Sequence, residues 1–166
     1  LTMRPAEENR LLPSDESPAT FWITNPANEF TGNVAAGSEA FGFWIALPEH
    51  PTGLSATDET DTTIWLRRTP LLRFSDNTAH SNDSRGLHVD DGPTVDGETE
   101  VTVYEPRLDP IPPGDGEEDS PSVTAVFDGF VAYKNRERGI WLRGVDHVVT
   151  NAVLADNAIG ATFASY

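Results

Sequence analysis

Cysteine is absent from this chain of 166 residues, so neither a disulfide framework nor a thiolate metal site can form. No apolar run reaches about 18 residues, the length that a transmembrane helix requires. Nothing at the start resembles a secretory leader. Because Leu-Thr-Met-Arg is not a natural beginning, we expect that a leader or whole domains were removed. We therefore expect the chain to be a piece of a longer protein, and we expect this segment not to insert into a membrane.

Positive charge is also scarce. Lys134 is the single lysine, and 11 lysines and arginines stand against 27 aspartates and glutamates, which gives a net charge of −16. Such a surface disfavours nucleic acid, anionic membranes and, by the same repulsion, acidic polysaccharides. Two other causes of the acidity stay open. A salt-loving source organism selects acidic, lysine-poor surfaces for solubility, and in an extracellular calcium-rich setting ions occupy some carboxylates.

Turn residues, in contrast, are abundant, with 13 glycines and 13 prolines, and they belong to an internal repeat. Four segments align without gaps from a start residue to a glycine nine positions later, and a short apolar run follows each glycine. The segments are Asn33–Gly42, Asn77–Gly86, Phe130–Gly139 and Asn151–Gly160, and the runs are Phe43-Trp44-Ile45, Leu87-His88-Val89, Ile140-Trp141-Leu142 and Ala161-Thr162-Phe163, with a further copy at Phe21-Trp22-Ile23. Apolar and variable positions alternate in these runs, which is the period of a β-strand rather than a helix.

The spacing of the runs predicts stacked rungs. Phe21 to Phe43 is 22 residues and Ile140 to Ala161 is 21, whereas the intervals between them stretch to 44 and 53. The additional residues, about 46–70 and about 90–122, are rich in proline, glycine and acids, as insertions in a solenoid are. We predict an all-β fold: one right-handed parallel β-helix over residues 1–166, with rungs of about 21–22 residues and two long loop insertions, cut from a longer β-helix. Asn/Gly loops of an ordinary β-sandwich are the alternative.

Three positions in the repeat carry finer expectations. The slot two after the start holds small residues, which suit tight stacking of rungs: Ala35, Ala79, Ala132 and Val153. The slot five after the start suggests a stacked polar ladder of side chains: Ser38, Asn82, Asn135 and Asp156. The repeat glycines fit a turn that needs positive φ.

Several phrases also carry a family resemblance. They are FWITNPANEFTGNVAAGSEAFGFWIALPEHPTG (21–53), NTAHSNDSRGLHVDDGP (77–93), VAYKNRERGIWLRG (131–144) and LADNAIGATFAS (154–165). These resemble the β-helix core of an extracellular family that contains the cell-migration-inducing hyaluronan-binding protein, its transmembrane relative, the fibrocystin-like proteins and microbial homologues. The resemblance implies a parallel β-helix, a secreted or cell-surface location and, in some members, calcium-dependent hyaluronan degradation. It transfers no catalytic residue, because the all-β domain that usually precedes this core has no counterpart here.

The central residue of each apolar run is predicted to point outward, because its apolar neighbours point inward. These residues form one column: Trp22, Trp44, His88, Trp141 and Thr162. Three tryptophans in a column predict a platform on which sugar rings stack through their CH faces, so Trp22, Trp44 and Trp141 are candidate substrate-binding residues. The alternative is that the insertions fold back and bury the column as a satellite core.

His88, Asp90 and Arg143 are the candidate catalytic residues, because they share one predicted face beside this column. A carboxylate near an imidazole suits general acid–base cleavage of a glycosidic bond, or, with Ca²⁺, deprotonation next to a uronate carboxyl. The structural alternative is a surface ion pair that contributes at most about 1 kcal/mol.

Tyr133, Lys134 and Arg136, with Arg138, make the single local basic cluster and are further substrate-binding candidates for a carboxylate or sulfate. They are equally suited to pair with Glu39 and Asp83 on neighbouring rungs. The acidic loops at 90–92 and 115–119 offer oxygen ligands without the ordered spacing of an EF-hand. Calcium is therefore a candidate cofactor, but the sequence requires no cofactor and identifies no set of metal ligands.

These observations favour a secreted or surface β-helix that interacts with polysaccharide, including the case in which it is part of a hydrolase or lyase acting within a longer chain. A non-catalytic stalk or adhesin module and a stable proteolytic fragment without separate activity are the alternatives. An open tryptophan column favours the first reading, whereas a column covered by residues 90–122 favours the other two.

Overall fold

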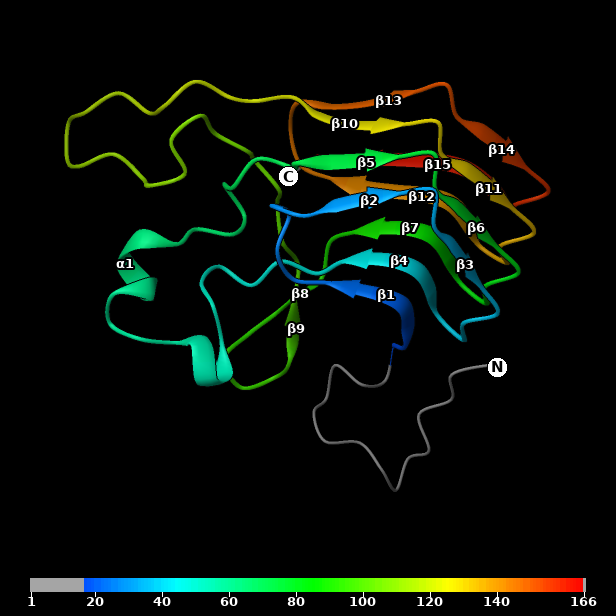
Figure 1. The fold of residues 1–166 in the computed structure, drawn as a ribbon, viewed down its shortest axis with the longest axis horizontal. Coiled ribbons are helices and arrows are strands. Elements are labelled where there is room, and N and C mark those ends of the chain that lie inside the picture. The colour runs from blue at the N-terminus through cyan, green and yellow to red at the C-terminus, as the bar shows by residue number, and fades with distance from the viewer. Residues whose placement is uncertain (1–16, 166) are drawn as a thin grey trace.

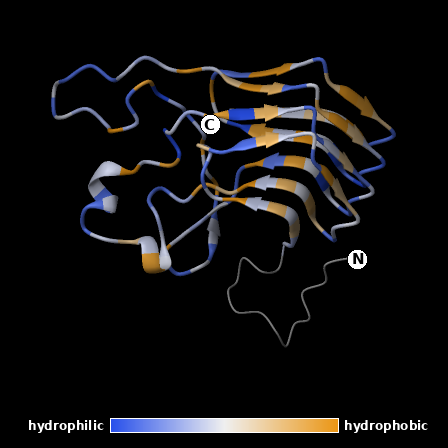
Figure 2. Cartoon of the chain, viewed as in Figure 1, coloured by the Kyte–Doolittle hydropathy of each residue, from blue (hydrophilic) through white to orange (hydrophobic). Residues whose placement is uncertain are grey.

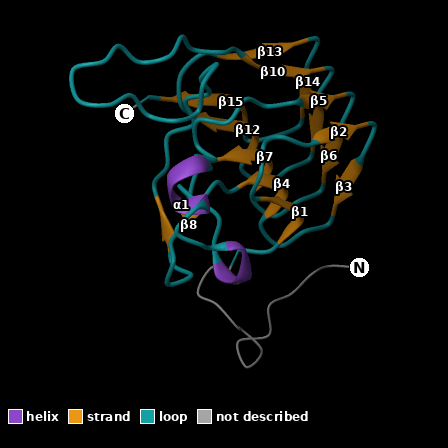
Figure 3. Ribbon diagram, turned by 60° about the vertical axis from the view of Figure 1, so that its left-hand side comes forward, coloured by secondary structure: helices purple, strands orange, loops and turns teal. Residues whose placement is uncertain are grey.

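The computed structural model describes residues 17–165, and most of its strands lie in three parallel sheets (Figures 1 and 3). Sheet A contains β1 (Ala19–Ile23), β4 (Phe41–Ile45), β7 (Arg85–Val89), β12 (Arg138–Arg143) and β15 (Ile159–Ala164). Sheet B contains β2 (Glu29–Thr31), β5 (Arg73–Ser75), β10 (Ala125–Asp128) and β13 (His147–Thr150). Sheet C contains β3 (Val34–Ala36), β6 (Thr78–His80), β11 (Val131–Tyr133) and β14 (Val153–Ala155). The chain thus visits the sheets in the repeating order A, B, C.

The five apolar runs pair along sheet A in the register that their alignment predicts. Phe21 pairs with Phe43, Phe43 with Leu87, Leu87 with Ile140, and Ile140 with Ala161. Strands distant in sequence therefore become neighbours, and each carries its apolar side chains on the same side as the next.

Side chains from all three sheets make one buried core, and hydrophobic residues recur along the strands of these sheets (Figure 2). Phe43 of sheet A, Phe74 and Phe127 of sheet B, and Phe130 at the start of sheet C are at most 1 % exposed. Their rings meet edge to face, with 5.3 Å between the centroids of Phe43 and Phe74 and 5.5 Å between those of Phe74 and Phe127. This is the preferred geometry of aromatic pairs, and it fills the space between short strands with few side chains.

The repeat glycines have a different role from the one predicted. Positive φ occurs at other positions, and Gly42, Gly86 and Gly139 are strand-associated residues of ordinary φ. A Cβ on any of these three would lie 2.6–2.7 Å from the carbonyl oxygen of the next glycine in the column. The column is therefore glycine because adjacent rungs approach too closely for a side chain.

Positive φ is instead concentrated at two corners of the fold. Between sheets B and C it occurs at Gly32, Asp76, Gly129 and Asn151, and between sheets C and A at Gly37, Ser81, Lys134 and Asp156. Stacked left-handed turns at fixed corners let consecutive rungs change direction in the same way.

The predicted polar ladder exists, with one correction. The side chains of Asn82 and Asn135 donate to the Oδ1 atoms of Asn135 and Asn157 at 2.8 and 3.0 Å, and the Ser38 amide donates to Asn82 Oδ1 at 3.1 Å. Asp156 is not in the ladder. Ala132 pairs with Leu154 rather than Val153. The last rung is one residue shorter than the others, and the alignment placed this deletion before the repeat start, whereas in the structure it follows Asn157.

The two longest connections both lead from sheet A to sheet B, and they lie together on one side of the molecule (Figure 1). The β4–β5 connection holds a 3₁₀ turn (Gly53–Ser55) and the short helix α1 (Thr60–Thr63), and the β7–β10 connection holds the antiparallel pair β8 (Gly92–Pro93) and β9 (Thr99–Glu100). The amides of Glu105 and Arg107 donate to the carbonyls of Arg67 and Arg68 at 3.0 and 2.8 Å. The connections therefore support each other.

Candidate functional site

The predicted column of central residues is formed, since Trp22 pairs with Trp44, Trp44 with His88, His88 with Trp141, and Trp141 with Thr162. Its members differ sharply in exposure. Trp22 is 47 % exposed, whereas Trp44 is 3 % and His88 is 0 % exposed. The middle of the column is thus not an open platform in this structure.

The β7–β10 connection and the first residues of the β4–β5 connection cover that middle. Trp44 packs with Phe41, Ala40 and Ala46 in a small second core on the outside of sheet A. Its indole N–H donates to the Asp90 carbonyl oxygen at 2.9 Å. This is the satellite core that the sequence left open as an alternative.

Asp90 lies at the centre of this covered region and is 3 % exposed. Oδ2 accepts hydrogen bonds from Arg143 Nε at 2.7 Å and Trp141 Nε1 at 2.9 Å, and Oδ1 accepts from the backbone amides of Asp91 and Thr102 at 2.8 and 3.0 Å. Burial alone would raise the pKa of Asp90, but the hydrogen bonds from Arg143, Thr102 and Trp141 outweigh it and hold that pKa below its ordinary value. The carboxylate is ionised and its acceptor sites are occupied.

His88 lies in β7, two residues before Asp90, and has its own hydrogen-bond partners. Arg85 Nη1 lies 2.9 Å from His88 Nδ1, and His88 Nε2 lies 3.0 Å from an Asp91 carboxylate oxygen. Burial lowers the pKa of His88 and, despite the neighbouring Glu137, that of Arg85. A neutral imidazole that donates from Nε2 to Asp91 and accepts at Nδ1 from Arg85 satisfies both contacts.

Trp141 is half-buried, and its ring is surrounded by cations. The guanidinium carbons of Arg85 and Arg138 lie 5.0 Å from the ring centroid and that of Arg143 lies 5.6 Å away. Cation–π contacts of this kind occupy the ring surface that a sugar would use. The structure therefore brings His88, Asp90, Arg143, Trp44 and Trp141 together, but as a packed cluster.

Sequence reasoning missed Arg85, Asp91 and Thr102 as members of this cluster. The three-residue spacing of Arg85, His88 and Asp91 was visible, but only the bend after β7 turns Asp91 back toward the imidazole. Asp91 has a φ of 51°, which a sequence pattern does not disclose for aspartate. Thr102 lies in the connection, whose path the repeat does not determine.

The other predicted group lies on the outer face of sheet C and the adjoining corner. The rings of His80 and Tyr133 stack with 4.7 Å between centroids and 10° between planes. Lys134 is exposed and has no ion-pair partner among residues 17–165, whereas Arg136 bonds Asp83 at 3.0 Å. Arg138 belongs to the Trp141 cluster rather than to this group. Tyr133, Lys134 and Arg136 thus lie apart from His88, Asp90 and Arg143.

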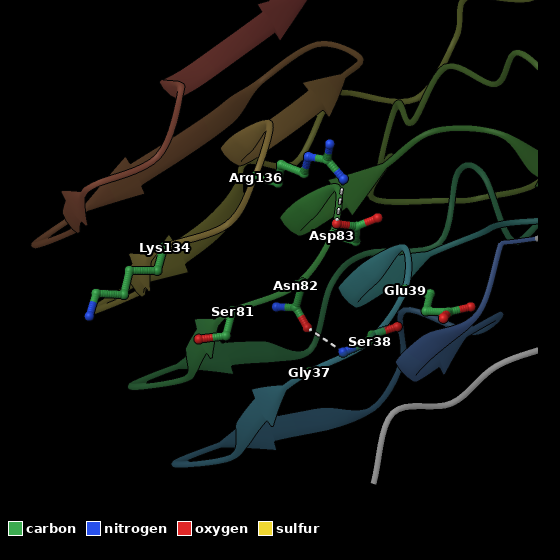
Figure 4. A pocket seen from close by; sticks show the side chains of 8 residues that line it. All are labelled: Gly37, Ser38, Glu39, Ser81, Asn82, Asp83, Lys134 and Arg136. Carbon is green, nitrogen blue, oxygen red and sulfur yellow. Dashed lines mark hydrogen bonds and ion pairs between the residues drawn. The ribbon is translucent and has the colours of Figure 1, made fainter.

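A polar groove of about 430 Å³ lies at this corner (Figure 4). Its lining residues come from three successive rungs: Gly37, Ser38, Glu39, Ser81, Asn82, Asp83, Lys134 and Arg136. Figure 4 shows the Lys134 side chain extending away from the Arg136–Asp83 pair. The groove thus offers one ammonium group that forms no ion pair within residues 17–165.

Three carboxylates of the two acidic loops, at 90–92 and 115–119, are engaged in protein contacts. Asp90 and Asp91 bond within the covered cluster, and Asp119 forms an ion pair with Arg68. Among residues 17–165 no three His, Asp or Glu side chains are grouped to hold a metal ion. Within that same range no helix is long and apolar enough to cross a membrane.

Comparison with known proteins decides the family. The family model described as CEMIP beta-helix matches residues 2–87, more than half of the chain. The chain belongs to the CEMIP beta-helix family. The matched residues include the first two rungs, with Trp22, Trp44 and the start of the glycine column, and the parallel sheets described above fit a β-helix.

Curated relatives of the family match over nearly the whole chain. Cell surface hyaluronidase CEMIP2 of Homo sapiens is 39 % identical over 155 residues, which cover 89 % of this chain and 11 % of that protein. The cell migration-inducing and hyaluronan-binding protein of Homo sapiens is 37 % identical over 154 residues, again 89 % of this chain and 11 % of that protein. Fibrocystin-L of Mus musculus is 31 % identical over 153 residues, 91 % of this chain and 3 % of that protein. The chain thus spans a small part of the length of each.

Proposed function

We propose that this chain is one right-handed parallel β-helix domain over residues 1–166, with rungs of about 21–22 residues, and that it contributes a polysaccharide-binding surface to a larger protein. We place that protein outside the cell or at its surface. Two relatives whose printed names include hyaluronan binding or hyaluronidase support the ligand class, and one of those names specifies the cell surface. Because the β7–β10 connection covers the middle of the tryptophan column, the column itself favours the stalk and fragment alternatives. The observation that carries the proposal is instead the family match together with a partly exposed aromatic pair on sheet C.

A binding role for this segment is better supported than a catalytic one. A general acid or base must reach the proton that it transfers, whereas His88 is 0 % and Asp90 is 3 % exposed. All four hydrogen bonds to the Asp90 carboxylate hold it to strands and connections. We infer that this cluster fixes the β7–β10 connection to sheet A, and that polysaccharide cleavage, where a longer protein performs it, uses other residues.

The test is retention of the purified 166-residue chain on immobilised hyaluronan, chondroitin sulfate, alginate and cellulose, together with the chain length of soluble hyaluronan after incubation. The expected result is retention on at least one polysaccharide and no shortening, with or without calcium. Measurements at low and at high salt separate specific binding from repulsion by the acidic surface. Retention on none of the four at either salt concentration would overturn the proposal, and hyaluronan shortening by the chain alone would overturn its non-catalytic part.

A further inference from the structure

We propose that the outer face of sheet C and its corner at Lys134 form a binding site for a saccharide chain that carries a carboxylate or a sulfate. This inference rests on the proposed function and specifies where the ligand binds and through which chemistry. Four features carry it: a stacked aromatic pair, short neighbours beside the pair, an uncommitted cation next to it, and a groove that continues from the cation.

Each ring of the aromatic pair has one face that the other ring does not cover, and both residues are partly exposed among residues 17–165. His80 pairs with Tyr133 in register, Ala36 pairs with His80, and Tyr133 pairs with Ala155. Since the rings stack on each other at 4.7 Å, close to the about 4.8 Å spacing of strands, the second face of each ring is directed toward an alanine. Ala36 and Ala155 are both exposed, and a methyl group is too short to cover a ring. Each alanine therefore leaves a notch into which the CH face of a pyranose fits against an aromatic face.

A neighbouring column of the same sheet widens the apolar surface beside the notches. Val34 pairs with Thr78, Thr78 with Val131, and Val131 with Val153. Val34 is 61 % and Val153 is 55 % exposed. Because these side chains are short, a chain of rings can lie across successive rungs of this column.

Lys134 gives the site its charge preference. It follows Tyr133 directly, and its φ of 55° turns the chain at the corner. The side chain points away from Asp83 and Arg136, whose charges neutralise each other (Figure 4). Asp156 holds the equivalent position on the next rung, so an anion is favoured at one rung only. An acidic group on a saccharide seated over Tyr133 would meet the ammonium group of Lys134.

The overall charge of −16 does not exclude such a ligand. Exposed charges farther apart than about 8 Å are largely screened at physiological ionic strength, so the charges nearest the site, Lys134 and the Asp156 carboxylate on the next rung, decide the interaction rather than the total. The strong negative field lowers the association rate at low salt. We therefore expect moderate salt to assist this binding, which is the reverse of the usual behaviour of a basic site.

The covered middle of the tryptophan column offers no comparable site. Trp44 is buried, and three guanidinium groups surround Trp141. The aromatic pair on sheet C stays partly exposed among residues 17–165.

The experiment titrates short hyaluronan oligosaccharides into the wild-type chain and its variants by calorimetry at fixed ionic strength. Carboxyl-reduced oligosaccharides and desulfated and sulfated chondroitin oligosaccharides form the other arms. We expect Lys134→Asn to weaken binding about three- to fivefold, as the loss of one exposed ion pair does. Asparagine tolerates the left-handed backbone, so this change should leave the fold intact. Lys134→Arg should retain binding, and Arg73→Gln on the outer face of sheet B is the matched control expected to change nothing.

Ala155→Leu fills the notch over Tyr133 without removing any group and should weaken binding about tenfold. Tyr133→Ala should have a similar effect, and melting curves establish that each variant is folded. Wild-type binding that Lys134→Asn and Ala155→Leu both leave unchanged would overturn this site but not the proposed function. Equal affinity for acidic and carboxyl-reduced oligosaccharides would overturn the anionic ligand class. Absence of wild-type binding to every saccharide would overturn the proposed function itself.

Discussion

The outer faces of sheets A and C carry similar residues, but the long connections cover the middle of the face of sheet A and leave the face of sheet C exposed. Both present a column with aromatic rings at its centre and basic side chains beside it. On sheet A the long connections fold over the column, and its polar groups bond one another until little capacity for a ligand is left. On sheet C the adjoining turns are short, the rings stay half-exposed and Lys134 stays unpaired among residues 17–165. Residue type alone therefore does not mark a site, because cover decides whether the chemistry is available.

Removing the hydrogen bonds of Asp90 on the covered face should have the largest effect on stability. Asp90→Ala removes the acceptor of Arg143 Nε, of the Trp141 indole N–H and of two backbone amides, of which the Thr102 amide is buried. We expect the free energy of unfolding to fall by about 3 kcal/mol or more. Denaturant unfolding followed by tryptophan fluorescence measures it. Asp96→Ala, in an exposed part of the same connection, is the control, and equal small losses in both variants would show that the cluster does not anchor the connection.

The glycine column supports both faces equally, and it offers a test with an internal control. A Cβ at Gly86 would lie 2.6 Å from the Gly139 carbonyl oxygen, whereas a Cβ at Gly160 meets nothing closer than 3.7 Å. We expect Gly86→Ala to cost about 2 kcal/mol through overpacking and Gly160→Ala to change stability by no more than about 0.5 kcal/mol. Thermal unfolding of the two variants measures the difference. Similar melting temperatures would contradict the close approach of rungs.

The smallest expected effect is on the pH dependence of stability, to which His88 on the covered face of sheet A should contribute. The pKa of His88 is lowered in the folded state, so the unfolded chain takes up a proton first. The contribution of the neutral imidazole is complete above an unfolded pKa of about 6.5 and is lost as pH falls below it. His147, whose pKa is also lowered by burial, acts in the same direction. We expect the melting temperature to fall between pH 7 and pH 5, and His88→Gln to flatten that decline. An identical decline in the wild-type protein and in His88→Gln would exclude His88 as its source.

The repeat spacing predicted the strands of sheet A and their pairing, because inward apolar side chains must stack on one another to be buried. It also predicted the Asn82–Asn135 contact. The role of the glycines was misjudged, since a sequence does not distinguish a glycine required by backbone approach from one required by positive φ. The register of the last rung was wrong over Val153–Asp156, because one missing residue can be placed on either side of the polar ladder without altering the alignment.

The candidate site was predicted less well than the fold. The grouping of His88, Asp90 and Arg143 followed from the repeat, but their cover did not. Residues 90–124 have no repeat partner, and their path is fixed by contacts such as Thr102 with Asp90 and Arg107 with Arg68. His80 and Tyr133 pair in the shared slot that the repeat predicted, yet the exposed ring faces depend on Ala36 and Ala155. The role of these alanines can be predicted only when the pairing of the strands is known.

The corners of the repeat differ in how much change they can accept. From sheet B to sheet C the chain always takes two residues, and from sheet C to sheet A it takes four or, once, three, whereas from sheet A to sheet B it takes from a few residues to a few dozen. The entropy of closing a loop rises only slowly with its length, so lengthening that one corner leaves the strands in register. The domain therefore has a single place where evolution, or an engineer, can exchange a whole segment and create a new surface while the ladder of asparagines and glycines stays intact.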